Sequence, residues 1–337
     1  MRSRTRPSRW FAVATCVAAL AVGACGDDGD DGASSDTTRA GPAELVKVEF
    51  PDLTFPTNLS AVYQEIKAEG IDKKHGIDLS LRKYATTDEP QQALATGTIG
   101  ISNFTLLNWA KLKNEGRDLE LVTPLIVERT KLIVKADSPY RSLADLRGKK
   151  IGSLPAGTGL YQNWRIVSEG LGLDFEEDFE HVPGPPPAVV GFLDSGQVDA
   201  AVLFEPFVAR LVSSGRYRQV MDAGEEWEKQ HGSTMHNLFV AATPGWLAGH
   251  RDAAAGLKAM FREGLALASG KPDFFGQYQE LLQIDDTAMD LAARNMATEV
   301  APNEPDATIE RDSRLVLEKA VELGFLTSAP IRVLAEV

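Results

Sequence analysis

One stretch, residues 131–173, constrains the fold of this chain more than any other. The apolar run 132–134 predicts a buried strand, and a second apolar run, 151–154, leads into the glycine loop 155–159. The spacing of apolar residues then predicts a helix over 160–170. A strand, a glycine loop and a helix in this order place free backbone N–H groups at the helix start, facing the carboxyl end of the strand. The stretch therefore predicts an α/β sheet with a loop suited to binding at one edge.

The glycine loop admits two interpretations. A dinucleotide-binding loop carries a third glycine where this chain has Gln162, and a phosphate-binding loop carries Lys and then Ser or Thr after its last glycine. Thr158 and Gly159, which follow Gly157, fit neither pattern, so nucleotide binding is not expected. The loop is either a binding loop for another ligand or only a tight turn.

The N-terminal residues have the composition of a secretory signal. Residues 1–9 contain four arginines and no acid, and the apolar run 10–24 is too short to span a bilayer as a stable helix. The tetrapeptide Val-Gly-Ala-Cys at 22–25 resembles the lipobox of bacterial lipoproteins, which implies cleavage before Cys25 and lipidation of its thiol. An ordinary signal with an incidental cysteine is the alternative. We therefore predict a lipoprotein signal peptide over 1–24.

Residues 25–44 predict a flexible acidic tether, because they are rich in Asp, Gly, Ser and Thr and poor in apolar residues. Their aspartates lack the spacing of a calcium-binding loop. Loss of the four signal arginines would take the formal charge from -13 to -17, which disfavours nucleic acid and anionic membranes as partners. Cys16 would leave with the signal, so the exported chain would have no internal disulfide and no thiol nucleophile beyond the anchor.

Strand and helix patterns alternate through the rest of the chain. Strands are predicted at 46–50, 77–81, 99–102 and 119–122, with helices between them, and this alternation predicts a parallel, doubly wound sheet. Residues 51–58 and 103–105 are predicted as loops, 198–204 as a buried strand, and 178–187, with four prolines, as an irregular loop. Beyond residue 252 the apolar positions have helical spacing, as in Leu257, Met260, Phe261, Leu265 and Leu267. The remaining length suits two lobes rather than one core.

Five segments, taken in order, carry a resemblance to a known family. They read KKHGIDLSL, ALATGTIGISN, LIVKADSPYRSLADLRGKKIGSLPAGTG, FLDSGQVDAAVLFEPF and NLFVAATPGWL. Together they resemble the solute-binding lipoproteins of ABC importers, in the group for alkanesulfonates, taurine, nitrate and thiamine-precursor pyrimidines. The resemblance covers residues 45–269. It implies the type II periplasmic-binding-protein fold: two α/β lobes, each a doubly wound mixed sheet flanked by helices, joined by two crossing segments.

The same resemblance implies where the lobes divide and where a ligand binds. Residues 45–128 and 236–337 would form lobe one, and residues 129–235 lobe two, with crossings near 127–132 and 236–241. The ligand would bind in the cleft between the lobes, at the carboxyl ends of strands, and closure of the lobes would trap it.

Matching positions in the family assigns ligand contacts to both lobes. The predicted contacts are Phe55, Asn58, Ser102, Asn103, Thr158, Gly159 and Glu205. Glu205 matches the acid of the family's Trp-Glu-Pro motif, although Phe204 replaces the tryptophan, which puts stacking from that position in doubt. Asn58 and Ser102 could instead cap helices, and Glu205 could hold a hinge or a helix end. If loop 155–159 donates and Glu205 accepts, a ligand with both an anionic oxygen and an amine is favoured over nitrate.

The resemblance implies a receptor rather than an enzyme. The expected protein is a lipid-anchored, extracytoplasmic monomer that captures a small polar or anionic organic solute, such as a sulfonate, taurine or a pyrimidine, and delivers it to an ABC permease and ATPase. The alternative is an enzyme on the same scaffold, a pyrimidine synthase or a desulfinase, which export and the lack of a usable cysteine disfavour. No catalytic residue and no cofactor are predicted. The five histidines match no metal-ligand spacing, so no metal site is predicted.

Overall fold

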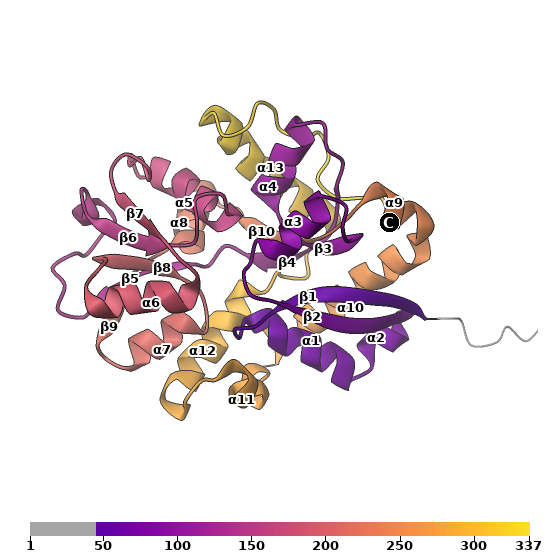
Figure 1. The fold of residues 1–337 in the computed structure, drawn as a ribbon, viewed down its shortest axis with the longest axis horizontal. Helices are drawn as coiled ribbons and strands as arrows, with labels where there is room; N and C mark the ends of the chain where they lie inside the picture. The colour runs from indigo at the N-terminus through magenta and orange to yellow at the C-terminus, as the bar shows by residue number, and fades with distance from the viewer. Residues whose placement is uncertain (1–44, 272) are drawn as a thin grey trace, which may run out of the picture. The chain divides into compact units, whose positions relative to one another are not determined.

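The structure is a computed structural model that describes residues 45–271 and 273–337 (Figure 1). The predicted signal peptide and the whole predicted tether, including Cys25, lie outside the described residues. None of the helices in the described ranges combines the length and the hydrophobicity that crossing a membrane requires.

The largest sheet has five strands in the order β7-β6-β8-β5-β9. Strand β6 runs parallel to β7 and β8, whereas β5 runs antiparallel to β8 and β9, so this sheet is mixed. Its strands are β5 (Lys131–Lys135), β6 (Lys150–Ser153), β7 (Glu180–Pro183), β8 (Ala200–Leu203) and β9 (Tyr217–Asp222).

Helices cover both faces of this sheet, which explains why its strands β5 and β8 are continuous apolar runs rather than alternating ones (Figure 1). Along β5, Leu132 and Val134 belong to the same buried cluster as Trp164 of α5, whereas Ile133 packs in a second cluster with Val189 of α6. The covering helices are α5 (Gly159–Glu169), α6 (Pro186–Ser195), α7 (Phe207–Ser213) and α8 (Ala223–His231), with a 3-10 turn, η1 (Ala144–Leu146).

The remaining strands form two smaller sheets. Strands β1 (Val46–Leu53) and β2 (Ile77–Tyr84) pair in parallel, and β10 (His236–Ala242) lies between β3 (Ile101–Thr105) and β4 (Glu120–Val127), antiparallel to both. Strand β1 contacts β3, so the two sheets are neighbours. Their helices are α1 (Asn58–Ala68), α2 (Ile71–Lys74), α3 (Glu89–Ala95) and α4 (Leu106–Asn114).

The parallel sheet that the alternation predicts is therefore wrong, whereas the mixed α/β fold that the family resemblance implies is confirmed. Alternation of strands and helices along the sequence predicts parallel neighbours, but β10 reaches its place from a distant part of the chain. No local pattern shows that a strand beginning at residue 236 separates two strands that end before residue 128.

Three predicted loops are also wrong in part. Residues 51–53 continue β1, and 103–105 belong to β3. The proline-rich segment 178–187 contains both β7 and the start of α6. Its prolines sit where a missing N–H is tolerated: Pro183 ends an edge strand, and Pro186 and Pro187 occupy the first turn of a helix.

The C-terminal third is helical, as predicted. Its elements are α9 (Pro244–Gly249), α10 (Arg251–Gly270), η2 (Phe275–Tyr278), α11 (Gln279–Leu282), α12 (Asp286–Glu299) and α13 (Asp306–Glu322). Four of the five predicted core positions of α10 are buried, whereas Leu267 is only partly buried. Helix α10 packs closely on α1, because a Cβ on Gly264 would lie 2.6 Å from Cγ1 of Ile66. Helix α12 packs against α7 and so connects this region to the elements around the five-stranded sheet.

The chain passes between the β3-β10-β4 sheet and the five-stranded sheet at two neighbouring places. One passage is 128–130, between β4 and β5, and the other is 232–235, between α8 and β10. The two passages touch, because the backbone N–H of Glu128 donates to the carbonyl of Met235 at 2.8 Å. The division into lobes at these passages stays a prediction.

Candidate functional site

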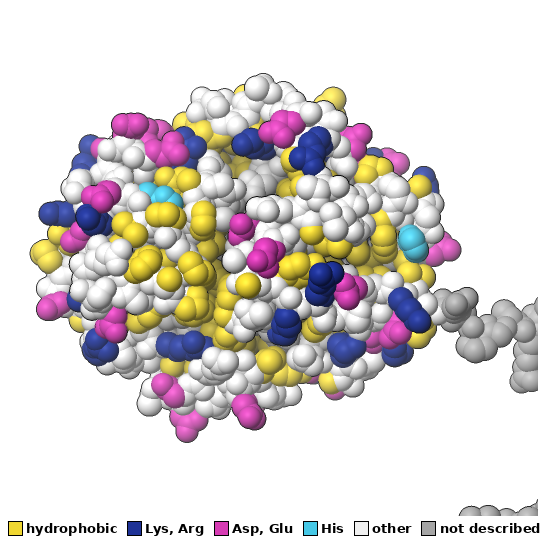
Figure 2. All heavy atoms as spheres, in the orientation of Figure 1, with side chains coloured by type: hydrophobic (Ala, Val, Ile, Leu, Met, Phe, Trp, Pro, Cys, Tyr) yellow, Lys and Arg dark blue, Asp and Glu magenta, His cyan; other side chains and the backbone are white. Residues whose placement is uncertain are grey.

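A cavity with about 930 Å³ of empty space, continuous with solvent, lies where helices α1 and α5 begin. Thr57 and Asn58 line it from the start of α1, and Thr158 and Gly159 line it from the start of α5. Figure 2 shows hydrophobic side chains gathered near the middle of one face of the molecule. The lining itself mixes apolar and polar side chains, as ligand-binding cavities do.

Both helix starts are built by threonine caps. The Oγ1 of Thr57 accepts from the N–H of Ser60 at 3.3 Å, and the Oγ1 of Thr158 accepts from the N–H of Tyr161 at 3.4 Å. Each cap satisfies one N–H of the first turn and leaves the positive end of the helix dipole directed at the cavity. Two helix N-termini at one cavity favour a ligand group that carries negative charge or oxygen lone pairs.

Amide side chains supply neutral hydrogen-bonding groups to the same cavity. Asn103 lines it from β3, Gln91 from α3 and Asn237 from the start of β10. Gln91 also accepts from the N–H of Thr105 at 3.3 Å, and Asn237 donates to Glu128 at 3.4 Å. The Nε2 of Gln91 also donates to the carbonyl of Thr87 at 3.3 Å. The amide of Asn103 and the side-chain oxygen of Asn237 leave this part of the wall able to donate or accept.

The three charged residues that line the cavity are all paired. Asp52 accepts from Lys83 at 2.6 Å, and Glu299 lies 3.4 Å from the Nζ of Lys131. Arg129, the third, is paired with carboxylates of Glu228 and Asp222. The described lining therefore offers no uncompensated charge. It also contains no histidine and no cysteine.

A buried charge cluster lies behind Glu299. The Nζ of Lys131 is 3.4 Å from Glu299 Oε1 and 3.5 Å from Asp222 Oδ2, and the N–H of Glu205 donates to Glu299 Oε1 at 3.2 Å. Burial raises the pKa of Glu299 to about 8, with Glu205 adding to the rise and Lys131 opposing it. Burial also raises the pKa of Glu205. For Lys131, burial acts to lower the pKa, but the surrounding carboxylates outweigh it and raise the pKa.

Four of the seven predicted contacts line the cavity: Asn58, Asn103, Thr158 and Gly159. Asn58 is also committed to structure, because its amide donates to Glu299 at 3.0 Å and its oxygen accepts from the N–H of Leu59 at 2.7 Å.

Phe55, Ser102 and Glu205 lie outside the lining. The ring of Phe55 packs against Phe207 at 6.1 Å between centroids, and Ser102 is fully buried within β3. Glu205 is 0% exposed, and its carboxylate accepts from the N–H of Ala209 at 3.0 Å. Its other oxygen accepts from Asn295 of α12 at 2.6 Å. The structure thus places Glu205 at the start of α7, in the helix-end position that was the alternative to ligand contact.

Several residues that line the cavity were not predicted from the sequence. Thr57 could have been found as the cap before the predicted helix, and Asn237 opens a segment that carries the family resemblance. Arg129 and Glu299 give no comparable signal, because they reach the cavity from segments without a local motif.

The start of α5 lies directly against the end of β3. A Cβ on Gly159 would be 2.4 Å from the Cβ of Thr105, and Asn108 of α4 donates to the carbonyl of Gly157 at 3.2 Å. Glycine at position 159 is therefore needed for this approach, which closes one side of the cavity.

Comparison with known proteins shows which family the chain belongs to. The model of the family described as NMT1/THI5 like matches residues 67–274, more than half of the chain. A curated relative from Brucella abortus (strain 2308), named as a candidate binding protein, is 26% identical over 159 residues, 46% of this chain and 46% of that protein. The chain thus aligns with about half the length of the curated relatives it matches.

Two solved structures share the fold. The alkanesulfonate-binding protein SsuA from Xanthomonas axonopodis pv. citri, bound to MOPS, has a TM-score of 0.67 at 16% identity, over 87% of this chain and 97% of that chain. The periplasmic nitrate-binding protein NrtA from Synechocystis PCC 6803 has a TM-score of 0.65 at 15% identity, over 85% of this chain and 83% of that chain. These likenesses establish the fold, and the predicted type II periplasmic-binding-protein architecture is confirmed.

Proposed function

The chain belongs to the NMT1/THI5-like family, and from that premise we propose that it is the extracytoplasmic solute-binding protein of an ABC importer. It captures a small polar or anionic organic solute in the cavity between α1 and α5 and delivers it to a permease and its ATPase. Names of relatives with this fold, an alkanesulfonate-binding and a nitrate-binding protein, support this class of role.

The observation that carries the proposal is the pair of helix N-termini at one cavity, Thr57–Asn58 and Thr158–Gly159. They favour an oxygen-rich headgroup such as a sulfonate. No uncompensated cation lines the described cavity, so recognition rests on N–H and amide donors rather than on an ion pair. Apolar side chains such as Leu160 and Phe204 in the same lining favour a ligand with an organic part, which disfavours nitrate.

An amine on the ligand is no longer favoured, because Glu205, its expected acceptor, does not line the cavity. A sulfonate or a pyrimidine-like solute therefore fits the lining as well as the zwitterion taurine does. Which of these the protein binds is the question for the experiment.

The enzyme alternative, a pyrimidine synthase or a desulfinase on this scaffold, finds little support in the cavity. Its described lining has no cysteine or histidine, and Glu299, the lining carboxyl whose pKa is raised, is held by Lys131 and Asn58 rather than free to act as a general base. We propose a binding protein without a catalytic residue or a cofactor, acting as a monomer. Two α/β lobes, 45–128 with 236–337 and 129–235, would close on the ligand.

We also propose that the protein is exported and held at the membrane by lipidation of Cys25. Support comes from the sequence, where the basic and apolar segments of residues 1–24 precede this cysteine. Mass spectrometry of the N-terminal peptide of the membrane-bound protein should find an acylated cysteine. An unmodified peptide that begins at another residue would rule the anchor out.

The function is tested by a ligand screen with the purified full chain. Alkanesulfonates of increasing chain length, taurine, nitrate, pyrimidines and aromatic acids are compared by thermal shift, and hits are confirmed by calorimetry. We expect at least one organic solute to bind with a Kd in the micromolar range or below, with no turnover of that solute. Chemical conversion of a bound solute would instead favour the enzyme. Binding of nitrate in preference to every organic solute would contradict the proposed ligand class.

A further inference from the structure

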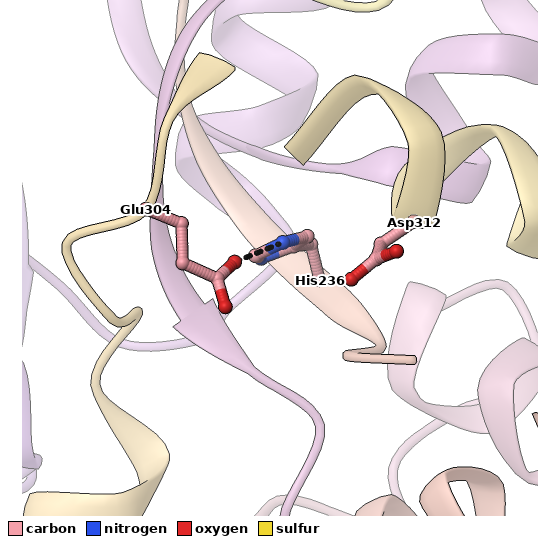
Figure 3. A group of neighbouring side chains, drawn as sticks. All are labelled: His236, Glu304 and Asp312. Carbon is pink, nitrogen blue, oxygen red and sulfur yellow. Dashed lines mark ion pairs between the residues drawn. The ribbon is translucent and has the colours of Figure 1, made fainter. Parts of the chain in front are cut away.

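Three side chains from distant parts of the chain meet beside the second passage (Figure 3). His236 is the first residue of β10, Glu304 lies between α12 and α13, and Asp312 lies in α13. One ligand atom from each residue lies within 4.8 Å of those of the other two. His236 is 0% exposed, and its Nε2 is 3.5 Å from Glu304 Oε2. The group therefore combines one imidazole and two carboxylates in a largely buried place.

The polar atoms of this group are not satisfied by the described protein. Neither ring nitrogen of His236 has a hydrogen-bond partner, and neither does Oε2 of Glu304. The 3.5 Å separation between the histidine and the glutamate is too long for a good hydrogen bond. Buried polar atoms are almost always satisfied in folded proteins, so unpartnered atoms from two facing residues call for an occupant between them.

We propose that His236, Glu304 and Asp312 bind one divalent transition-metal ion of the zinc type, with water completing the coordination. An imidazole nitrogen with carboxylate oxygens is a donor set that zinc takes, whereas calcium prefers six or more oxygen ligands. In a tetrahedral site with bonds of about 2.0–2.1 Å, ligand atoms lie about 3.3 Å apart. His236 and Glu304 are close to this separation, at 3.5 Å, whereas the group as a whole, with separations of up to 4.8 Å, must contract around the ion.

The charges of the two carboxylates, and the hydrogen bonds that neighbouring residues donate to Asp312, suit a divalent cation. Two carboxylates face one imidazole, and Arg311 pairs with the carboxylate of Asp312 only, so a cation between the three side chains would balance the remaining negative charge. Asp312 is already oriented, because Oδ2 accepts from the N–H of Thr234 at 3.1 Å and Oδ1 from Nε of Arg311 at 2.7 Å. Such outer contacts fix the direction of a metal-binding carboxylate, and each oxygen keeps a further lone pair for the ion.

A route from solvent to the site is present. A surface cavity with about 800 Å³ of empty space is lined by Asp312 together with His231, Ser233 and Arg311. Glu304 has a side chain that is 26% exposed, so water can also reach the site from its side. An ion can therefore enter without unfolding of the chain, and water is available as a ligand.

The bound ion would hold the start of β10 to the C-terminal helix. His236 belongs to β10 and Asp312 to α13, and these two elements lie far apart along the chain. Thr234, beside the site, belongs to the second passage. The ion would fix the end of that passage. We expect it to be structural, because none of its three ligands lines the cavity between α1 and α5.

The test uses the full chain, stripped of metal with a chelator and titrated with Zn²⁺ in the absence of any organic ligand. We compare wild type with Glu304→Gln and His236→Gln by calorimetry and by the absorption spectrum of the Co²⁺-loaded protein. The matched control is His250→Gln, which removes an exposed histidine outside the group. Glu304→Gln is the variant least able to disturb folding, because Oε2 of Glu304 has no hydrogen-bond partner to lose.

Wild type and His250→Gln should bind one more equivalent of Zn²⁺ than Glu304→Gln, or bind it at least tenfold more tightly, and His236→Gln should resemble Glu304→Gln. Saturating Zn²⁺ should raise the Tm of wild type by about 5 °C and that of the two ligand variants by less. Equal binding and equal Tm shifts in wild type and Glu304→Gln would overturn the site, even if His236→Gln failed to fold. Absence of Zn²⁺ binding to wild type would overturn it as well.

Discussion

The carboxylate of Glu128 accepts a hydrogen bond from the side-chain amide of Asn163 at 2.7 Å. Glu128 lies in the passage between β4 and β5, and Asn163 lies in α5, the helix whose start lines the cavity. The same carboxylate accepts from the N–H of Thr130 at 3.0 Å and from Asn237 of β10 at 3.4 Å. One buried carboxylate thus connects the first passage and β10 to a helix of the candidate site.

Asn163→Ala should destabilise the protein more at pH 8 than at pH 5. Burial raises the pKa of Glu128, and the hydrogen bonds from Thr130 and Asn163 oppose that rise. A raised pKa in the folded state means that stability is lost as pH rises above the unfolded value of about 4.3. Losing Asn163 raises the folded pKa further, at a cost of about 1–3 kcal/mol at pH 8. Urea unfolding of wild type and Asn163→Ala at pH 5 and pH 8 measures this loss of unfolding free energy.

A double-mutant cycle with Glu128→Gln gives the control. The pH dependence of the Asn163→Ala effect should disappear when position 128 cannot ionise. An equal loss of stability at pH 5 and pH 8 in the single variant would show that this hydrogen bond does not stabilise the ionised carboxylate.

Glu299→Gln should flatten the fall in stability between pH 5 and pH 8. The pKa of Glu299 is raised to about 8, so the folded protein binds a proton that the unfolded chain releases above about pH 4.3. Folding therefore becomes less favourable through this window, by on the order of 1–4 kcal/mol. Unfolding free energies of wild type and variant across the window measure the difference, with Glu280→Gln, an exposed glutamate, as control. Identical slopes would contradict the raised pKa.

Gly159→Ala should open the cavity side formed by α5 and β3. The new Cβ would meet Thr105 at 2.4 Å, so the helix start must move away, with a loss of about 1–3 kcal/mol. We expect a larger radius of gyration in solution scattering and at least tenfold weaker binding of the solute found in the screen. Gly157→Ala is the control, because a Cβ there has nothing within 4 Å. Equal effects of the two variants would show that the contact with Thr105 is unimportant.

Glu205→Gln should lower stability and leave ligand affinity unchanged. Its carboxylate accepts from the N–H of Ala209 and from Asn295, and loss of charge in these hydrogen bonds should cost about 1–3 kcal/mol. Thermal unfolding and calorimetry with the solute separate the two effects. Weaker binding at an unchanged Tm would restore Glu205 as a ligand contact.

Asn103→Asp should weaken binding of an anionic solute by tenfold or more, about 1.4 kcal/mol, because it adds a negative charge to the cavity wall. Asn103→Ser keeps a neutral hydrogen-bonding group and should lose less. Calorimetry at two salt concentrations measures both, since repulsion between charges weakens in salt. Equal losses in the two variants would mean that the ligand carries no negative charge near this position.

Local patterns were enough to predict most helices and strands, because each depends on its own apolar spacing and caps. The start of α5 is an example, because the glycine loop 155–159 and the apolar spacing after it predict a helix that begins near residue 160. The place of β10 could not be predicted, because its neighbours are chosen by contacts more than a hundred residues away along the chain. Two side-chain contacts could not be predicted for the same reason. Asn58 pairs with Glu299, and His236 lies beside Glu304 and Asp312.

The central position of β10 also sets an order of events during synthesis. When residues 101–127 have been made, the strand that separates β3 from β4 has not. More than a hundred further residues, including the whole five-stranded sheet, must follow before residues 236–242 can fill the gap. The β3-β10-β4 sheet is therefore completed late, although two of its three strands are made early, and a chain that ends before residue 236 lacks the partner of both β3 and β4. Folding of this sheet must wait for residues 236–242.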